Sequence, residues 1–356
     1  MPHLFDPLTL RGVTLRNRTG ISPMCMYSAD NGFANDWHWV HYGARAVGGA
    51  GLVMFEATAV EARGRITPRD LGLWDDAQVE PLARITRFLK DHGAVPGIQI
   101  AHAGRKASTY PPFGAPASGS LPADDPSGWQ TVGPSPLAFS ENYNQPHELT
   151  IPEIETIQAA FAATAIRALA AGFECLEIHA AHGYLLHSFY SPLSNQRGDA
   201  YGGSFDNRIR FLMETARKVR NIWPERLPLA VRLSCTDWVE NGWSISDSIM
   251  LSGKLKAEGV DLIDCSAGGN LRQGPTNIGP GYQVPFAEAI RRETGIATAA
   301  VGMITAPEQA DEIIRNGRSD MVLIARSALR DPYWPLHAAQ ALKKDAPIPG
   351  QYLRGF

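Results

Sequence analysis

Short apolar runs alternate with longer amphipathic or alanine-rich segments along the whole chain. The runs are rich in β-branched and aliphatic residues, which is typical of buried parallel strands, and the longer segments have the length of helices. Eight such units predict an α/β fold, a (β/α)8 TIM barrel. The expected strands are residues 19–22, 52–57, 95–101, 175–179, 229–234, 262–266, 298–301 and 321–324, and the expected helices include residues 76–91, 152–171, 206–222, 246–258 and 307–316.

Glycine follows several of the helical runs. This residue is frequent just past the end of a helix, because it adopts a left-handed backbone conformation without a steric penalty. The glycines expected to end helices are Gly93, Gly172, Gly259, Gly295 and Gly317.

Two segments lie outside the repeating pattern. Residues 8–10 and 13–15 predict a small hairpin that closes the N-terminal mouth of the barrel. Residues 107–150, after the third strand, are rich in Pro, Gly, Ser and Asp and are too long for a passive connection. Because active sites in this fold lie at the C-terminal ends of the strands, we expect this loop to shape the site.

The end of the fourth strand carries an unusual group of polar ring side chains, namely His179, His182 and Tyr184. The alternation of a strand points Glu177 and His179 into the barrel. A single histidine is commonly a satisfied structural residue, but two imidazoles and a phenol at this place favour a functional site. The alternative is a metal-dependent TIM-barrel hydrolase with His179 and His182 as ligands, completed by Glu177 or Asp264.

Two polar residues, Arg232 and Gln99, interrupt apolar strands at interior positions. A salt bridge across the barrel would satisfy the arginine, whereas a heterocycle with carbonyl and ring-nitrogen acceptors would satisfy both residues. The loops at residues 301–305 and 325–327 follow the last two strands, a common phosphate-binding place in this fold. Arg326 would add a guanidinium there.

Composition and charge limit the kinds of molecule that the protein is expected to bind. Apolar residues make up 44% and charged residues 19% of the chain, so we expect residues 1–356 to form one domain with a large core. The net charge of −3, without a basic block, favours a small molecule over nucleic acid or a membrane surface. We see no signal peptide and no membrane-spanning run. The four cysteines lack the spacing of a zinc or redox motif, which fits a reducing cytoplasm and predicts no metal.

Three separated motifs occur in the order and spacing of a known family. They are Ser-Pro-Met-Cys-Met-Tyr at residues 22–27, His-x-x-His-Gly-Tyr at residues 179–184, and Tyr-Gly-Gly-Ser-x-x-Asn-Arg-x-Arg-Phe at residues 201–211. With these motifs the chain resembles the Old Yellow Enzyme family of FMN-dependent ene-reductases and NADPH dehydrogenases. The resemblance covers essentially the whole length.

Further features resemble the thermophilic-like subclass of that family. They are the paired Cys25 and Tyr27, the run at residues 99–106, and the ending at residues 354–356. The chain departs from the family where Ala325 replaces a common glycine, although a backbone N–H remains there. The loop after the third strand is also longer than in compact members, which leaves the size of the substrate open.

The resemblance implies a bound FMN, with NADPH or NADH as the hydride donor. No Rossmann glycine motif is present, so the nicotinamide is expected to visit the same face of the flavin as the substrate. The implied FMN-binding residues are Ser22, Pro23, Met24, Cys25, Ala57, Gln99 and Arg232 around the ring system, and Gly302, Met303, Ala325 and Arg326 around the phosphate.

The implied reaction is reduction of the activated C=C bond of α,β-unsaturated carbonyl compounds, with nitro compounds as further candidates. His179 and His182 would bind the substrate oxygen as an oxyanion hole. Tyr184 would donate the proton, for which an ordinary pKa of about 10 is suitable. Tyr27 would hydrogen-bond the substrate, and Cys25 would tune the potential of the flavin.

The same resemblance implies a homodimer or a larger homo-oligomer. The C-terminal tail would cross the interface and place Arg354 at the neighbour's substrate site, with Tyr352 and Phe356 as apolar anchors. A solvated, frayed tail is the alternative. For the whole chain, a non-catalytic flavin-binding protein on a reused barrel is the second alternative to the enzyme.

Overall fold

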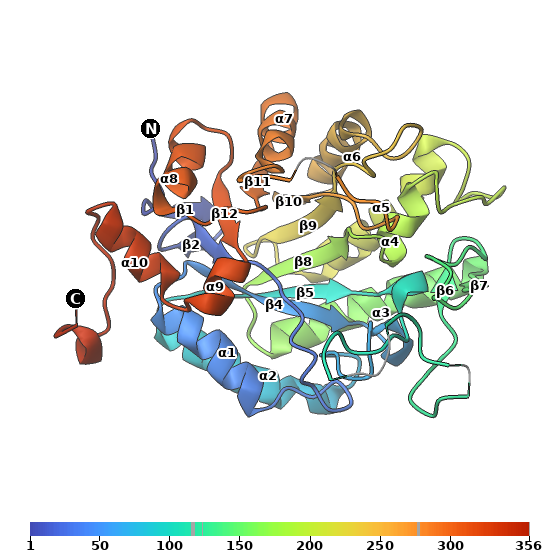
Figure 1. The fold of residues 1–356 in the computed structure, drawn as a ribbon, viewed down its shortest axis with the longest axis horizontal. Coiled ribbons are helices and arrows are strands. Elements are labelled where there is room, and N and C mark those ends of the chain that lie inside the picture. The colour runs from blue at the N-terminus through green and yellow to red at the C-terminus, as the bar shows by residue number, and fades with distance from the viewer. Residues whose placement is uncertain (115–117, 123, 276–277, 356) are drawn as a thin grey trace.

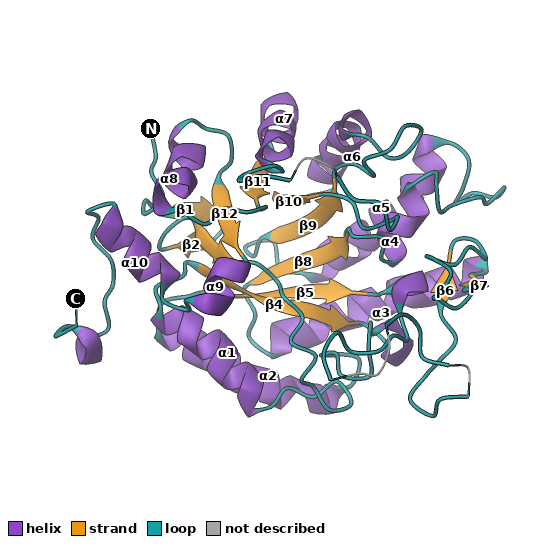
Figure 2. Ribbon diagram, in the orientation of Figure 1, coloured by secondary structure: helices purple, strands orange, loops and turns teal. Residues whose placement is uncertain are grey.

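The computed structural model describes residues 1–114, 118–122, 124–275 and 278–355. Within them, parallel strands close into a barrel in the order β3-β4-β5-β8-β9-β10-β11-β12 and back to β3 (Figure 2). The predicted (β/α)8 fold is therefore confirmed. The barrel strands are β3 (Thr19–Ile21), β4 (Leu52–Ala59), β5 (Val95–Ala101), β8 (Cys175–Ala180), β9 (Leu229–Ser234), β10 (Leu262–Ser266), β11 (Ala297–Ala300) and β12 (Met321–Ile324).

The predicted limits of most strands agree closely with these bounds, and β4 differs most because it continues to Ala59. Its pairing with β5 shifts register between Phe55 and Ala57, where a β-bulge places Glu56 opposite no partner. A bulge bends a strand and changes the direction of nearby side chains.

Helices surround the barrel (Figure 1). The predicted helix at residues 76–91 is a 3-10 turn, Asp76–Gln78, followed by α2. Helices α1 and α7 also cover the barrel, although the sequence analysis did not single them out. The helices are α1 (Asp36–Val47), α2 (Val79–Asp91), α3 (Ile151–Ala170), α4 (Leu185–Tyr190), α5 (Phe205–Ile222), α6 (Ile245–Ala257), α7 (Val284–Thr294), α8 (Pro307–Arg315), α9 (Arg326–Arg330) and α10 (Trp334–Ala341), with further 3-10 turns at Ala62–Gly64, Gly104–Lys106 and Gly350–Tyr352.

Local sequence signals explain where several helices begin and end. At the start of α3, the Glu153 amide donates to the Thr150 hydroxyl, and the Glu153 carboxylate accepts from the Thr150 amide. This reciprocal pair satisfies amides that have no partner inside the helix. The glycines predicted to end helices all have positive φ angles, which confirms them: Gly93 (73°), Gly172 (82°), Gly259 (87°), Gly295 (63°) and Gly317 (68°).

The N-terminal hairpin consists of β1 (Leu8–Leu10) and β2 (Val13–Leu15), paired antiparallel as predicted. In the turn, the Arg11 guanidinium lies 2.5 Å from the Asp261 carboxylate, and the Gly12 amide donates to the Arg226 carbonyl at 2.9 Å. Asp261 and Arg226 precede β10 and β9. The hairpin therefore lies at the N-terminal ends of the strands, as expected.

The long loop after β5 lies at the opposite end, toward which the strand arrows point in Figure 1. It contains the short pair β6 (Val132–Gly133) and β7 (His147–Glu148). Arg197 joins this loop to the region after α4 by donating to the carbonyls of Leu149 (2.6 Å) and Pro134 (3.2 Å). None of the helices in the described residues has the length and apolar character needed to cross a membrane.

Candidate active site

The chain turns sharply after β8 and brings together the three ring residues singled out from the sequence. The His179 ring centroid lies 5.1 Å from that of His182 and 5.0 Å from that of Tyr184. In the turn, His182 and Gly183 have φ angles of 60° and 74°. A Cβ on Gly183 would lie 2.2 Å from the Gly269 carbonyl oxygen, so only glycine fits there. The left-handed conformation of His182 costs roughly 1–2 kcal/mol, which the surroundings must offset.

Polar contacts from other strands hold this turn. The His182 amide donates to Ser234 Oγ at 2.8 Å, and Lys106 Nζ donates to the His182 carbonyl at 2.8 Å. The Lys106 ammonium also lies 5.1 Å from the centre of the Tyr184 ring. Removal from water, followed by the charge of Arg105, lowers the pKa of Lys106 to about 7. Lys106, just after β5, is thus bound to the turn that follows β8.

Both imidazoles are neutral near pH 7. Removal from water, followed by the Arg232 guanidinium, lowers the pKa of His179 and of His182 well below its ordinary value. His179 Nδ1 accepts from the Ala181 amide at 3.2 Å, so its proton is on Nε2. His182 Nε2 lies 2.7 Å from Ser266 Oγ. His179 can therefore offer its Nε2–H to a guest, and His182 can offer its Nδ1–H when the Ser266 hydroxyl donates to its Nε2.

Tyr27 and Tyr184 line a cavity of about 340 Å³ beneath the long loop. Removal from water is the main reason that the pKa of each phenol is raised well above 10. Both hydroxyls therefore stay protonated, and the ordinary pKa expected for Tyr184 was wrong. Other residues lining this cavity include Ile66, Thr67, Lys106, Thr109, Tyr110 and Tyr143.

The loop after β3, which carries Cys25, is anchored by the carboxyl group of Glu56 on the bulge of β4. Glu56 accepts from the Met26 amide at 2.8 Å and from the Tyr42 hydroxyl at 3.0 Å. Burial raises the pKa of Glu56 to about 8, so this carboxyl group is mainly protonated at pH 7. Removal from water, then the carboxyl groups of Asp70 and Glu56, raise the pKa of Cys25, which remains a thiol.

The polar residues of the barrel interior form two pairs. Gln99 Nε2 donates to Glu177 Oε1 at 2.7 Å. Arg232 Nε lies 3.0 Å from Asp264 Oδ2, in an orientation that gives a charge contact without a hydrogen bond. Burial raises the pKa of both carboxyl groups, and the Arg232 charge opposes this shift. The salt bridge considered from the sequence is therefore present, but Arg232 also faces a cavity.

This second cavity, of about 540 Å³, lies at the C-terminal ends of β9 to β12. Gly302 and Met303 in its wall have φ angles of 116° and 52°. A Cβ on Gly302 would lie 3.0 Å from the side-chain Nε2 of Gln283, so the positive φ and the close neighbour both favour glycine. The cavity is lined by His182, Arg232, Ser266, Gln283, Gly302, Met303, Ala325, Arg326, Ser327 and Arg330, among others.

Comparison with known proteins assigns the barrel to a family. A sequence model described as the NADH:flavin oxidoreductase / NADH oxidase family matches residues 3–345. The chain belongs to this family. The NADPH dehydrogenases of Geobacillus sp. (strain WCH70) and Bacillus subtilis (strain 168) are 48% and 45% identical to it over 355 residues, which is 99% of this chain and 98% and 99% of theirs.

Solved structures agree on the fold of this flavin oxidoreductase. Morphinone reductase matches with a TM-score of 0.80 at 24% identity, over 97% of this chain and 91% of its own. The old yellow enzyme homologue from Zymomonas mobilis matches with a TM-score of 0.78 at 25% identity, over 97% and 94%. The predicted family resemblance and the class of flavin-dependent oxidoreductase are confirmed.

The residues around the larger cavity of this flavin oxidoreductase fit FMN. The cavity volume is in the range of about 300–1,000 Å³ that is typical of cofactor sites. Arg232 offers a guanidinium at its inner end, where the buried Nε lacks a hydrogen-bond partner among the described residues. At the outer end, Arg326 and Arg330 suit a phosphate, beside the positive-φ backbone of Gly302 and Met303.

Strand register explains why the predicted ring-binding residues come from different strands. Ala57 pairs with Gln99, and His179 pairs with Arg232, so these side chains lie in adjacent rows of one barrel. The Ser22 amide donates to the Ile324 carbonyl at 3.1 Å and leads the chain from β3 into the site loop. Pro23, Met24 and Cys25 follow in that loop, each half-buried.

The C-terminal tail was predicted to act at a neighbour's site, and none of its described residues lines either cavity of its own chain. Figure 1 shows the C-terminus beyond α10, away from β6 and β7. Arg354 is exposed, and the Tyr352 hydroxyl lies 3.2 Å from that of Tyr333. Phe356 lies outside the described residues.

Several lining or anchoring residues were not predicted as site residues. They are Glu56, Lys106, Gln283 and Arg330. The signal for Glu56 was present, because one carboxylate interrupts the apolar run of β4. Lys106 ends the family-like run at residues 99–106, but the sequence did not predict a function for its side chain. Gln283 and Arg330 carry no comparable signal. Gln283 immediately precedes α7 and Arg330 is the last residue of α9, and polar residues are common at both kinds of position.

The metal-ligand alternative lacks a suitable cluster. Across the described ranges, no three His, Cys, Asp or Glu side chains are grouped to hold a metal ion. The neighbouring carboxyl groups of Glu177 and Asp264 face Gln99 and Arg232 instead.

Proposed function

We propose that residues 1–356 form one FMN-dependent ene-reductase, which takes hydride from NAD(P)H and reduces the activated C=C bond of α,β-unsaturated carbonyl compounds. The observation that carries this proposal is the meeting of two neutral imidazoles and one protonated phenol, with His182 in the wall of the cavity that fits FMN and Tyr184 in the wall of a second cavity. Relatives at 45% to 48% identity are NADPH dehydrogenases, which supports NADPH as the donor.

Bound FMN supplies a centre that accepts hydride from the nicotinamide and passes it to the alkene. The work of this chain is to stabilise the charge that develops on the carbonyl oxygen of the substrate. His179 would donate through Nε2–H. His182 would donate through Nδ1–H when the Ser266 hydroxyl donates to its Nε2. Loss of one such donor typically costs about 2.7–4 kcal/mol of transition-state stabilisation.

Tyr184 would then protonate the α-carbon. Its raised pKa keeps the hydroxyl protonated until the substrate carries negative charge. Lys106, 5.1 Å from the ring centre, would favour the phenolate that forms as the proton leaves in the fraction of molecules in which its amine is protonated. Tyr27, in the same cavity, would donate a hydrogen bond to the substrate. Cys25 would tune the flavin potential as a neutral thiol.

The nicotinamide and the alkene would occupy the same smaller cavity in turn. Support comes from the arrangement of the two cavities, which places His182 in the wall of one and the neighbouring Tyr184 in the wall of the other. The two ring centroids are 6.5 Å apart, so a guest held beside Tyr184 would also lie close to His182. Nitro compounds, with oxygen acceptors like those of an enone, are further candidate substrates.

The assembly and location are part of the proposal. An exposed tail that carries Arg354 beside Leu353, which is 62% exposed, suits an interface in a homodimer or larger homo-oligomer. There Arg354 would reach the neighbour's substrate cavity. The four cysteines are free thiols, which supports a reducing cytoplasm as the location.

The purified protein tests this function directly. We expect a flavin absorption spectrum, release of FMN on denaturation, and NADPH oxidation that is stimulated by 2-cyclohexenone with formation of cyclohexanone. A protein that holds FMN but forms no cyclohexanone would contradict the ene-reductase assignment. A colourless protein that cannot be reconstituted with FMN would contradict the cofactor assignment as well.

A further inference from the structure

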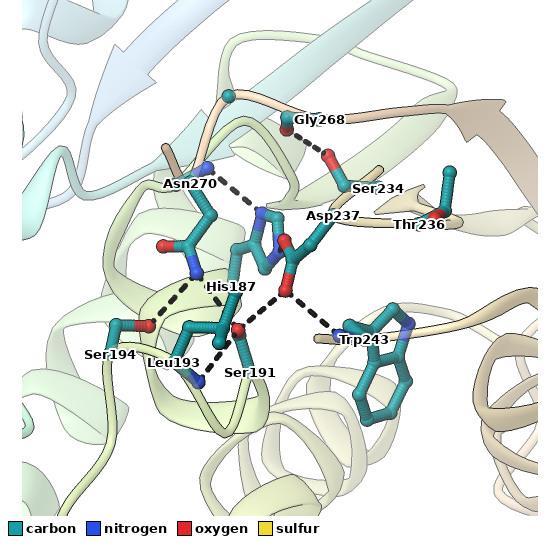
Figure 3. Close-up of polar contacts among 12 residues, drawn as sticks. His187, Ser191, Leu193, Ser194, Ser234, Thr236, Asp237, Trp243, Gly268 and Asn270 are labelled. Carbon is teal, nitrogen blue, oxygen red and sulfur yellow. Dashed lines mark hydrogen bonds and ion pairs between the residues drawn. The ribbon is translucent and has the colours of Figure 1, made fainter. Parts of the chain in front are cut away.

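A buried hydrogen-bonded pair lies directly behind the catalytic turn. His187 Nδ1 accepts from the Gly183 amide at 2.9 Å, and His187 Nε2 lies 3.0 Å from Asp237 Oδ1 (Figure 3). Both side chains are fully buried. Neither residue lines the cavity that contains His182 or the one that contains Tyr184, and the proposed reaction assigns them no role.

The partners determine the protonation state of this pair. An amide can only donate, so His187 Nδ1 is unprotonated and the ring proton is on Nε2, where it is donated to Asp237. Asp237 Oδ2 accepts from Ser191 Oγ at 2.6 Å and from the Trp243 amide at 2.9 Å. A carboxylate with three donors is strongly held in its ionised form. His187 is therefore a neutral imidazole whose orientation is held by the ionised Asp237 carboxylate.

Through Ser191, Asp237 is also connected to the segment at residues 269–270, against which the turn packs. Asn270 Nδ2 donates to Ser191 Oγ at 2.8 Å, as Figure 3 shows, and Arg105 donates to the Asn270 side chain and carbonyl. The neighbouring Gly269 carbonyl is the group that excludes any side chain on Gly183. The same network thus holds the turn and the surface that limits it.

The held conformation is one that the chain would not adopt by itself. His182 and Gly183 both have positive φ angles, and the residue after them is the proposed proton donor, Tyr184. Rotation of the Gly183 peptide would move the His182 ring and the Tyr184 ring together. A displacement of about 1 Å in such groups can slow a reaction by roughly a hundredfold.

From these contacts we infer that His187 and Asp237 are positioning residues, which act through the Gly183 amide to orient His182 and Tyr184 toward the substrate. This inference deepens the proposed function and rests on it for the identity of the substrate. The pair touches neither guest nor cofactor, so its effect is on the placement of the groups that do.

Variants of His187 separate positioning from packing. In H187N, the side-chain oxygen can take the place of Nδ1 and accept from Gly183, whereas H187L fills the space without an acceptor. S252A is the matched control, because Ser252 is a buried hydroxyl on α6 whose bond to the Ser248 carbonyl is separate from the pair. D237N tests the hydrogen bond between Asp237 and His187, since the side-chain amide of asparagine cannot replace all of the carboxylate's acceptor positions.

The readout is the affinity of phenol for the FMN-loaded protein, measured from the change in the flavin spectrum, together with FMN content and Tm. We expect H187L and D237N to raise the Kd of phenol about tenfold to a hundredfold while FMN remains bound, because a misplaced His182 would lose its hydrogen bond to the phenol oxygen. H187N should stay much closer to the wild type, and S252A should equal it. The alkene half-reaction, followed by stopped flow, should slow in the same order.

Several results would overturn the inference. They are a wild-type phenol Kd in FMN-loaded H187L, equal losses in H187N and H187L, or, if H187L does not fold, a wild-type Kd in D237N. A wild-type protein that shows no response to phenol would also overturn it. Because phenol binding needs neither NADPH nor an alkene, failure of the wild type to form cyclohexanone would reject the proposed reaction while leaving this test intact.

Discussion

Replacement of Tyr184 by phenylalanine tests the proton donor without disturbing the turn that carries it. The ring contacts of Tyr184, with the His179 ring at 5.0 Å and the Lys106 ammonium at 5.1 Å, do not involve the hydroxyl. The fold and the bound FMN should therefore be retained. General acid catalysis typically contributes about 10²–10⁴-fold, equivalent to roughly 2.7–5.5 kcal/mol, and we expect alkene reduction to slow by that factor.

The two half-reactions can be measured separately by stopped-flow absorbance of the flavin. Reduction by NADPH needs no proton from Tyr184 and should keep its wild-type rate, whereas reoxidation by 2-cyclohexenone should slow. Y110F is the matched control, because Tyr110 lines the same cavity and is assigned no proton transfer. Since the pKa of Tyr184 is raised well above 10, its titration should not shape the wild-type rate between about pH 6 and 9. Equal slowing of both half-reactions, or of neither, would refute the assignment.

Four further outcomes are expected. Alanine at both His179 and His182 should leave FMN bound but weaken phenol binding in spectral titrations, and a wild-type Kd would exclude the oxyanion-hole role. C25A should shift the flavin reduction potential, measured against a dye of known potential, whereas an unchanged potential would leave Cys25 with packing alone. R354A should raise KM for the enone without a change in the mass measured by light scattering. Deletion of the last four residues should raise KM and also weaken the proposed dimer. A deletion variant with wild-type mass and wild-type KM would contradict the tail proposal. The pKa of Glu56, about 8 in the fold and about 4.3 when unfolded, means that its stabilising contribution falls as pH rises between these values. E56Q should therefore lose less Tm than the wild type between pH 6 and 9, and equal losses would show that Glu56 does not titrate there.

Much of the site could be predicted because it lies on regular strands. The alternation of a barrel strand places Glu177 and His179 inside, and the structure confirms this orientation through the contact of Glu177 with Gln99. The ends of the eight strands meet at one rim, so polar residues after β8 and β12 could be expected to face a common space.

Features that depend on contacts between distant segments could not be predicted. The raised pKa of Tyr184 arises from removal of the phenol from water by a loop far away in sequence, so an ordinary value was expected. The role of Glu56 depends on the bulge, and strand alternation alone gives no sign of a shifted register. His187 was not singled out from the sequence, because its partner Asp237 lies on the loop after a different strand.

The bulge at Glu56 also lets β4 carry one more residue than its neighbour while the pairing on either side stays regular. Upstream of it, Leu52 to Phe55 pair one-to-one with Val95 to Ile98, and downstream Ala57 to Ala59 pair one-to-one with Gln99 to Ala101. Paired residues of neighbouring strands point to the same face, so the side chains beyond the bulge keep the faces of their β5 partners. Deletion of Glu56 alone would leave this pairing regular and would remove the carboxyl group that holds the Met26 amide and the Tyr42 hydroxyl. The extra codon in β4 therefore serves the loop that carries Cys25 and not the barrel itself.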